Sequence, residues 1–170
     1  KLEYVLGMPF VSGNAVKVLK NGDEIFPAML EKIRESKHSI FLLTYIYWTG
    51  QVAVDFAEVL SDKALKGLDV RVIIDAMGSK IMPEKLLKQM QASGVKFCWY
   101  HPVSRIAFWQ IDNRTHRRVL ICDNNYAFTG GVGIAKEWEG NARNPSEWRD
   151  THFQIEGPAV ASISGGFWHN

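Results

Sequence analysis

Cysteine, long apolar runs and an excess of either charge are all scarce in this chain of 170 residues. Its two cysteines, Cys98 and Cys122, lie inside apolar, strand-like runs, so the disulfide framework of a small secreted domain is excluded. No run approaches the ~20 apolar residues that a transmembrane helix needs. A net charge of +2 without clustered lysine and arginine is not typical of a dedicated nucleic-acid binder.

Apolar residues make up 46% of the chain, and their arrangement is regular. Strand-like runs and helical periodicities alternate from the amino-terminal end to about residue 100. The strands are expected at 16–19, 39–48, 69–75 and 95–100, and the helices at 24–37, 52–64 and 83–93. This alternation predicts one α/β domain over residues 1–170, with a mostly parallel β-sheet covered by helices on both faces.

The pattern changes after residue 115 to a strand, a tight turn and a second strand. A polar, tryptophan-containing loop at 136–148 follows, then a strand at 150–157 and a final helix after Pro158. No internal repeat, low-complexity segment or linker rich in proline and glycine divides the chain. One domain is therefore expected to include this second part as well.

Four polar side chains follow the predicted central strands. The carboxyl ends of the strands are where α/β sheets commonly place their ligand-binding and catalytic residues. They are Tyr45 and Tyr47 after one strand, and Asp75 and Ser79 after the next. Each has an ordinary structural explanation: a tyrosine at a strand end packs with its hydroxyl in water, and Asp75 caps a turn. We expect structural roles for these four more than functional ones.

The stretch "NRTHRRVLICDNNYAFTGG" (113–131) is harder to explain as ordinary folding material. Because side chains alternate along a strand, His116 and Arg118 are expected on one side, at the head of an apolar run. Leu120 and Cys122 should share that side, and Val119 and Ile121 should point the other way, into an apolar layer. The residues Asp123-Asn124-Asn125-Tyr126 then have the composition of a two-residue hairpin loop. Gly130 and Gly131 follow the return strand and allow close approach of backbone to a ligand. A histidine, a fixed cation and accessible backbone together suit the binding of, and attack on, a phosphoryl group.

A plainer interpretation of the same stretch is a surface hairpin. A lone histidine near a strand start is more often structural than catalytic. Arg114, Arg117 and Arg118 would then form a solvated edge that discourages aggregation. Composition alone slightly favours this plainer interpretation, and the exact spacing of the residues reverses that preference.

That spacing resembles the signature of the phospholipase D superfamily: His, any residue, Lys, four residues, Asp, six residues, then Gly-Gly or Gly-Ser. The chain has His116-Arg117-Arg118, "VLIC", Asp123, "NNYAFT" and Gly130-Gly131. The resemblance covers nearly the whole chain and is closest to the bacterial cardiolipin synthase-like branch. The segments "VKVLKNGDEIFPAMLEKI", "GLDVRVIIDAMGS", "ASGVKF" and "WRDTHFQIEGPAV" all fit that branch.

The resemblance implies a two-step transfer at a phospholipid phosphate, without metal or cofactor. His116 is then the nucleophile, through a phosphohistidine, or its acid/base partner, and Arg118 contacts phosphate oxygens. Asp123 is the motif aspartate, and the turn makes it a brace for the hairpin. An acidic residue is also expected at the far nitrogen of the histidine. Asp150 is the first candidate and Glu147 the second, although Asp150 equally suits an ion pair with Arg149.

Two departures from the family pattern stand out. Arg118 replaces the motif lysine, so a planar guanidinium, which binds phosphate through two nitrogens, replaces a compact ammonium. Gly133 occupies a position where the family commonly has asparagine.

The chain also contains one motif, whereas the family's active site needs two that face each other. We therefore expect the amino-terminal lobe of a two-lobed enzyme, with a homodimer as the alternative. The resemblance places it in the bacterial cytoplasm or at the cytoplasmic face of the membrane, with a membrane surface as partner. A homodimeric endonuclease acting on nucleic acid, and a degenerate domain that binds anionic lipid, are the other functions considered.

Overall fold

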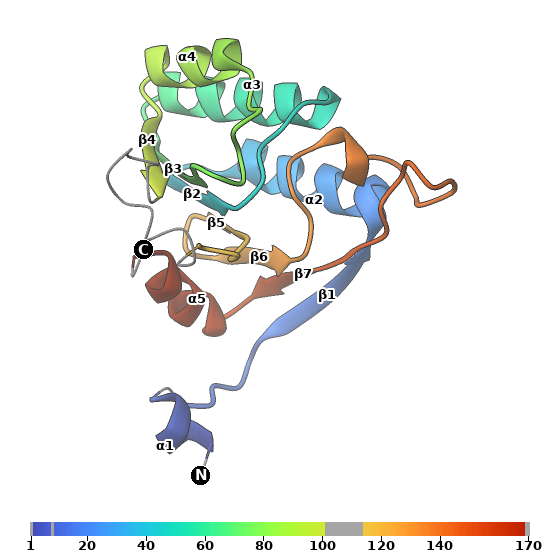
Figure 1. Ribbon diagram of the computed structural model, residues 1–170. Helices are drawn as coiled ribbons and strands as arrows, with labels where there is room; N and C mark the ends of the chain where they lie inside the picture. Colours follow the sequence, from blue (N-terminus) through green and yellow to red (C-terminus); the bar gives the residue numbers. More distant parts are fainter. Residues whose placement is uncertain (1, 8, 101–113, 169–170) are drawn as a thin grey trace.

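The computed structural model describes residues 2–7, 9–100 and 114–168, and it places helices on both faces of a seven-stranded sheet (Figure 1). In chain order the elements are α1 Leu2–Leu6, β1 Ala15–Lys20, α2 Asn21–Glu35, β2 Ser39–Thr44, α3 Gln51–Leu65, β3 Asp69–Asp75, α4 Glu84–Ala92, β4 Lys96–Tyr100, β5 Val119–Cys122, β6 Tyr126–Gly130, the short 3-10 helix η2 Lys136–Trp138, β7 Thr151–Glu156 and α5 Ala159–Trp168. The predicted alternation of strands and helices is confirmed. The strand expected at 39–48 is shorter and ends at Thr44.

The strand order across the sheet is β1-β7-β6-β5-β2-β3-β4. The pairs β2/β3 and β3/β4 are parallel, and the four other neighbouring pairs are antiparallel. Five strands share one direction, since only β5 and β7 run the other way. The α/β sandwich is confirmed. The expectation of a mostly parallel sheet is wrong, because four of the six neighbouring strand pairs are antiparallel. A tight turn or a direct return of the chain places two strands antiparallel to each other. Each of the reversed strands, β5 and β7, lies between two strands of the common direction.

This mixture of directions decides which residues meet at one edge of the sheet. The carboxyl ends of β2, β3 and β6 lie at the same edge as the amino ends of the reversed strands β5 and β7. Residues that follow the first three strands therefore meet residues that precede the other two. The end of β1 also lies at this edge, where Lys20 pairs with Thr151.

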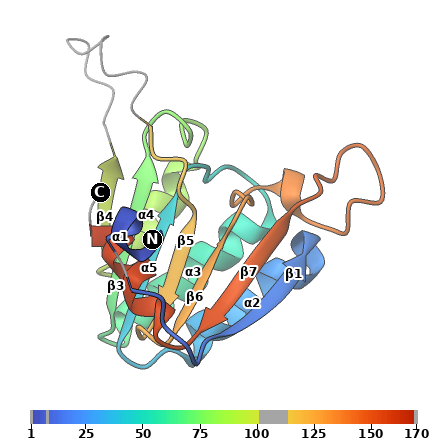
Figure 2. The ribbon, with the colours of Figure 1, turned by 90° about the horizontal axis from the view of Figure 1, so that it is seen from below.

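The sheet separates two apolar cores. Helices α2, α3 and α4 cover one face, and α5 covers part of the other (Figures 1 and 2). Strand β5 shows why the sequence alternates here: Leu120 and Cys122 pack into the larger core, whereas Ile121 packs with Phe41 and Phe167 on the α5 side. The alternation expected for this strand is confirmed.

The turn between β5 and β6 contains three residues. Asp123 and Asn124 both have a φ of 53°, and the Asn125 amide donates to the Cys122 carbonyl at 3.0 Å. Aspartate and asparagine tolerate this left-handed conformation better than most residues do. The expected hairpin is confirmed, with one more residue in its loop than predicted.

One expected location is different. His116 and Arg118 lie in an irregular segment, 114–118, that leads into β5, and not within the strand itself. Among residues 2–7, 9–100 and 114–168, no helix combines the length and the apolar character that crossing a membrane requires.

Candidate active site

His116 and Arg118 meet over one aromatic ring at the sheet edge described above. The imidazole of His116 is stacked on Tyr45, with ring centroids 4.2 Å apart and planes 20° from parallel. The guanidinium carbon of Arg118 lies 5.9 Å from the centroid of the same ring. Tyr45 directly follows β2, and the segment with His116 directly precedes β5, its antiparallel neighbour. The two motif side chains are therefore brought together, although the strand geometry that predicted it is absent.

Arg118 is a half-buried cation with spare hydrogen-bonding capacity. One terminal nitrogen donates to the His116 carbonyl at 3.0 Å, and within the described part of the chain its buried Nε has no hydrogen-bond partner. Burial lowers the pKa of the guanidinium, and the negative charge of Asp150 acts against that shift. A desolvated donor on a fixed cation suits a phosphate oxygen, which accepts charge-assisted hydrogen bonds.

Asp150, directly before β7, and His152, within β7, lie against the end of β6. A Cβ added to Gly131 would lie 2.5 Å from both carboxylate oxygens of Asp150, and one added to Gly130 would lie 2.4 Å from Nδ1 of His152. The two glycines therefore make room for side chains of the neighbouring strand. Close approach of their backbone to a ligand stays a prediction.

The Asp150 carboxylate is held at two points. One oxygen accepts a hydrogen bond from the indole nitrogen of Trp138 at 3.1 Å, and the other accepts from the amide of Thr151 at 2.7 Å. Asp150 is close enough to Arg118 and His152 to influence the pKa of each. No hydrogen bond joins Asp150 to His116 in the described ranges, so the expected contact with the far imidazole nitrogen is not formed here.

His152 is a buried histidine that the sequence pattern did not single out. It is 1% exposed, and its Nδ1 has no hydrogen-bond partner among the residues that the structure describes. Burial lowers its pKa to about 4; the carboxylate of Asp150 acts against this shift, and the charge of Arg118 adds to it. At neutral pH the side chain is therefore uncharged, beside a cation and an anion. The signal available in the sequence was its spacing of two from Asp150, which places both side chains on one side of β7.

Asp123 lies at the opposite edge of the sheet from His116. Its carboxylate accepts backbone hydrogen bonds from Lys37, His38 and Ser39, each at 2.8 Å. Burial alone would raise its pKa, but these three bonds hold the pKa below the ordinary value. This geometry agrees with a brace, because the carboxylate joins the hairpin to the chain that enters β2. It lies beyond the end of β5 that is remote from His116.

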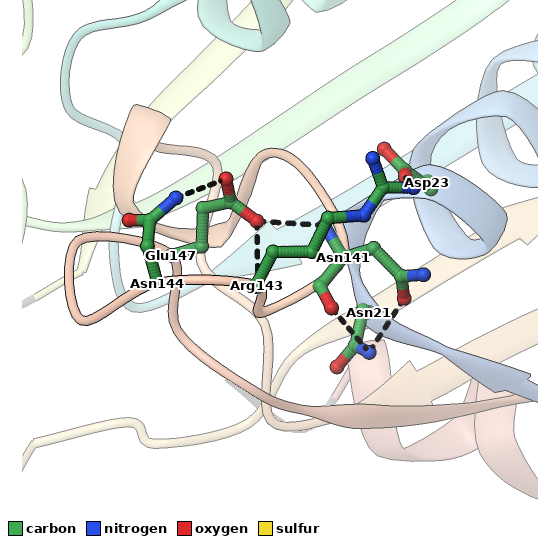
Figure 3. Close-up of polar contacts among 6 residues, drawn as sticks. All are labelled: Asn21, Asp23, Asn141, Arg143, Asn144 and Glu147. Atoms are coloured by element: carbon green, nitrogen blue, oxygen red, sulfur yellow. Dashed lines mark hydrogen bonds and ion pairs between the residues drawn. The ribbon is translucent and has the colours of Figure 1, made fainter.

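Glu147 is committed to its own loop, as Figure 3 shows. Its carboxylate accepts from the amides of Asn141 and Arg143, both at 3.0 Å, and from the side chain of Asn144 at 2.6 Å. Those bonds lower its pKa, with the Arg143 amide contributing most. Of the two acidic candidates, Asp150 is the one that lies beside Arg118.

The same loop is attached to the start of α2. The Asn21 side chain donates to Asn141 Oδ1 at 2.9 Å, and the guanidinium of Arg143 lies 3.9 Å from Asp23 (Figure 3). The Asn21 amide also donates to the Asp150 carbonyl at 3.0 Å. Asn21 has a φ of 57°, which lets β1 pass directly into α2 at this contact. The loop therefore fixes the backbone that carries Asp150.

Comparison with protein-family models identifies the family. Residues 29–147 match the family model described as the phospholipase D-like domain of cardiolipin synthase. The chain belongs to this phospholipase D-like family. The matched range includes His116, Arg118, Asp123 and both motif glycines, so the resemblance that rested on their spacing is confirmed.

Curated relatives in this phospholipase D-like family are cardiolipin synthases. The chain is 30% identical to cardiolipin synthase 1 of Bacillus cereus over 164 residues, which is 95% of this chain and 32% of that protein. It is 34% identical to cardiolipin synthase of Geobacillus thermodenitrificans over 165 residues, or 95% of this chain and 33% of that protein. The chain thus spans about a third of the length of these relatives.

Solved structures show the phospholipase D-like fold. Nuc of Salmonella typhimurium, described as a phospholipase D family member, has a TM-score of 0.68 at 18% identity, with 92% of this chain and 93% of that chain covered. NucT of Helicobacter pylori has a TM-score of 0.66 at 14% identity, covering 92% and 95%. At these sequence identities the two structures show similarity of fold alone.

One departure from the phospholipase D-like pattern has a structural explanation. A Cβ at Gly133 would lie 2.7 Å from Cβ and Cγ2 of Ile46 and 2.9 Å from the indole of Trp138. The space that an asparagine would need at this position is filled by two apolar side chains. Trp138 is also the residue that donates to Asp150.

Buried His152 predicts a specific loss of stability in mild acid. Its folded pKa of about 4 lies below the ordinary 6.5, so the unfolded chain binds an extra proton between these values. The free energy of unfolding should therefore fall as the pH drops from about 6.5 to about 4, by a total on the order of 2–4 kcal/mol. The pKa of Asp123 is lowered too, but its stabilisation is lost only below about pH 4.

Urea unfolding between pH 7 and pH 4 measures this slope. His152→Gln should flatten it, whereas His38→Gln, at an exposed position, serves as the matched control. Equal slopes for the parent protein and His152→Gln would contradict the prediction.

Proposed function

We propose that this chain is a catalytic lobe of a phospholipase D-type phosphodiesterase or phosphatidyltransferase that acts on phosphatidylglycerol-type lipids. The observation that carries the proposal is the convergence of His116 and Arg118 over Tyr45, with the Arg118 Nε unpaired among the described residues. Membership of the family and similarity to cardiolipin synthases over 95% of the chain support the choice of substrate.

In the proposed reaction His116 is the nucleophile. One imidazole nitrogen forms a bond to phosphorus while the bond from phosphorus to the leaving alcohol breaks. A histidine from a second motif donates a proton to the departing oxygen. The acceptor alcohol then gives its proton to that second histidine and attacks phosphorus, which releases His116. Each step forms one bond to phosphorus and breaks another, and neither step needs an oxidant or a reductant.

The surrounding residues have distinct proposed roles. Arg118 binds the non-bridging phosphate oxygens and stabilises the charge that develops on them in the transition state. Asp150 holds the Arg118 cation within reach by electrostatic attraction, and Trp138 and Thr151 hold Asp150. Asp123 stabilises the hairpin that carries the motif.

The second motif is proposed to come from another lobe of the same polypeptide. The cardiolipin synthases that the chain matches are about three times as long as the matched region, which leaves room for such a lobe. Pairing of two copies is the alternative, because Nuc is covered over 93% of its length by this one fold. In either case the lipid headgroup would lie between the two motifs, at a membrane surface.

Arg118 provides the experiment that tests this function. The full-length protein is assayed with phosphatidylglycerol vesicles for formation of diphosphatidylglycerol and release of glycerol. Arg118→Ala should lower kcat/KM roughly 10²- to 10³-fold, which corresponds to about 2–4 kcal/mol of lost transition-state stabilisation. Arg118→Lys should keep most of the activity, because the family motif uses the ammonium at this position.

Arg117→Ala is the matched control, since the exposed Arg117 donates to a carbonyl of α5 and lies outside the site. If Arg118→Ala unfolds the domain while the folded fraction keeps full activity, Arg118 is a structural residue and the proposed site is wrong. Cleavage of DNA with no lipid turnover would favour the homodimeric endonuclease. Binding of anionic vesicles without turnover of either substrate would indicate a degenerate domain.

A further inference from the structure

Tyr45 is the side chain that contacts both motif residues. We propose that it is a positioning residue, whose ring holds the His116 imidazole in the orientation required for attack on phosphorus. The inference rests on the proposed function, in which His116 reacts. It adds a residue that the family signature does not contain, because Tyr45 lies 71 positions before His116 in the sequence.

His116 needs such a support because little else restrains it. It lies in an irregular segment, its side chain is exposed, and no residue of the described ranges forms a hydrogen bond with its ring. A free imidazole would rotate about two side-chain bonds. A ring stacked at 4.2 Å and 20° limits that rotation and leaves the ring edge, where the nitrogens lie, open to a ligand.

Tyr45 itself is fixed from behind by the turn that follows β3. The Ser79 hydroxyl donates to the Tyr45 carbonyl at 3.0 Å and accepts from the Tyr47 amide at 2.8 Å, and Ser79 is 1% exposed. A Cβ on Gly78 would lie 2.2 Å from the Tyr45 carbonyl and 2.8 Å from its ring. The turn thus packs directly against the backbone and one edge of the ring of Tyr45.

Asp75 connects this support to the segment that carries His116. Its carboxylate is fully buried, and one oxygen accepts from the amides of Met77 and Gly78, both at 2.9 Å. The same oxygen lies 3.8 Å from a guanidinium nitrogen of Arg114, two residues before His116. The supporting turn and the reactive segment therefore share one buried anion, and Tyr45 lies between them. Tyr45, Ser79 and Asp75, for which the sequence predicted structural roles, thus form one assembly behind the segment that carries His116.

The expected effect of this assembly is on turnover and not on substrate affinity. Misplacement of a reactive group by about 1 Å can cost about 10²-fold in rate. If the ring only orients His116, its loss should lower kcat and leave KM nearly unchanged, because phosphate binding resides in Arg118. A residue that merely fills space would change thermal stability without this division.

The experiment replaces the ring in two ways in the full-length protein, with the phosphatidylglycerol assay as readout. Tyr45→Phe retains the stacking surface and should keep kcat within about 3-fold. Tyr45→Leu removes the planar ring at similar volume and should lower kcat roughly 10- to 100-fold, with KM within about 3-fold. Tyr126→Leu, a half-buried tyrosine at the opposite end of β6, is the matched control and should leave kcat unchanged. Tyr45→Ile replaces the leucine variant if thermal unfolding shows that the latter does not fold.

Three outcomes would overturn the inference: a leucine variant with normal kcat, a phenylalanine variant as defective as leucine, or a raised KM with kcat unchanged. His116→Ala separates this failure from failure of the proposed function. If His116→Ala is fully active, the proposed function is wrong. If His116→Ala is inactive and Tyr45→Leu is normal, only the role of Tyr45 is wrong.

Discussion

Replacement of His116 by alanine in the full-length protein is expected to abolish turnover, with a loss of at least about 10³-fold in kcat. As nucleophile or as acid/base partner, the imidazole makes or breaks a bond in both steps, and among residues 2–7, 9–100 and 114–168 no neighbouring group is placed to substitute for it. His152 is buried and uncharged at neutral pH, and it lies on β7 behind the motif glycines. Protein stability should change little, because His116 is exposed.

The measurement combines rate and covalent trapping. A phosphatidyl donor that carries label in its phosphatidyl group should leave an acid-labile label on the parent protein and none on His116→Ala. His38→Ala, at an exposed position near the opposite edge of the sheet, should label normally. EDTA should leave the rate unchanged in this mechanism. Inhibition by EDTA that Zn²⁺ or Mg²⁺ reverses would instead indicate metal-assisted hydrolysis and would contradict the phosphohistidine.

The second large effect is expected at the two motif glycines. Gly131→Ala places a methyl group 2.5 Å from both Asp150 carboxylate oxygens, which Trp138 and Thr151 hold in place. Asp150 must move, and Arg118 loses the anion beside it. We expect kcat/KM to fall on the order of 10²-fold in a protein that still folds.

Gly130→Ala should act mainly on the fold. Its added methyl group would lie 2.6 Å from the Thr151 carbonyl and 2.8 Å from Cα of His152, which are backbone atoms of the paired strand. Overpacking of this kind costs roughly 1–3 kcal/mol of the free energy of unfolding. Gly165→Ala in α5 is the control, since an added Cβ there contacts nothing within 4 Å. If Gly131→Ala and Gly165→Ala show the same kcat/KM, the proposed contribution of Asp150 is wrong.

Much of the fold was predictable because it depends on local pattern. The period of the apolar residues placed the helices and strands, and the alternation in β5 assigned Leu120 and Ile121 to opposite faces. The hairpin after Cys122 followed from residues that tolerate positive φ. The strand order was not predictable in this way, since pairing between distant strands leaves no periodic signal in either strand.

The same distinction between local pattern and contacts of distant strands applies to the candidate site. The spacing of His116, Arg118 and the glycines indicated the motif, but the partners of those residues come from other strands. The sequence predicted a structural role for Tyr45 and did not single out His152, because only the sheet brings these two residues to the motif. The strand geometry expected for His116 was also wrong, since His116 lies in an irregular segment before β5 and is stacked on Tyr45.

The pairing of β1 with β7 has a consequence for the order in which the protein is made. Asp150 is attached to Asn21 by hydrogen bonds in both directions, across a sequence separation of 129 residues. Contacts of such long range form late, because the entropy of closing the intervening chain must be overcome first. On the ribosome, a nascent chain that has already formed the hairpin with His116 still lacks β7, Asp150 and His152. Arg118 therefore acquires its neighbouring carboxylate only after the segment that leads into β7 has been synthesised.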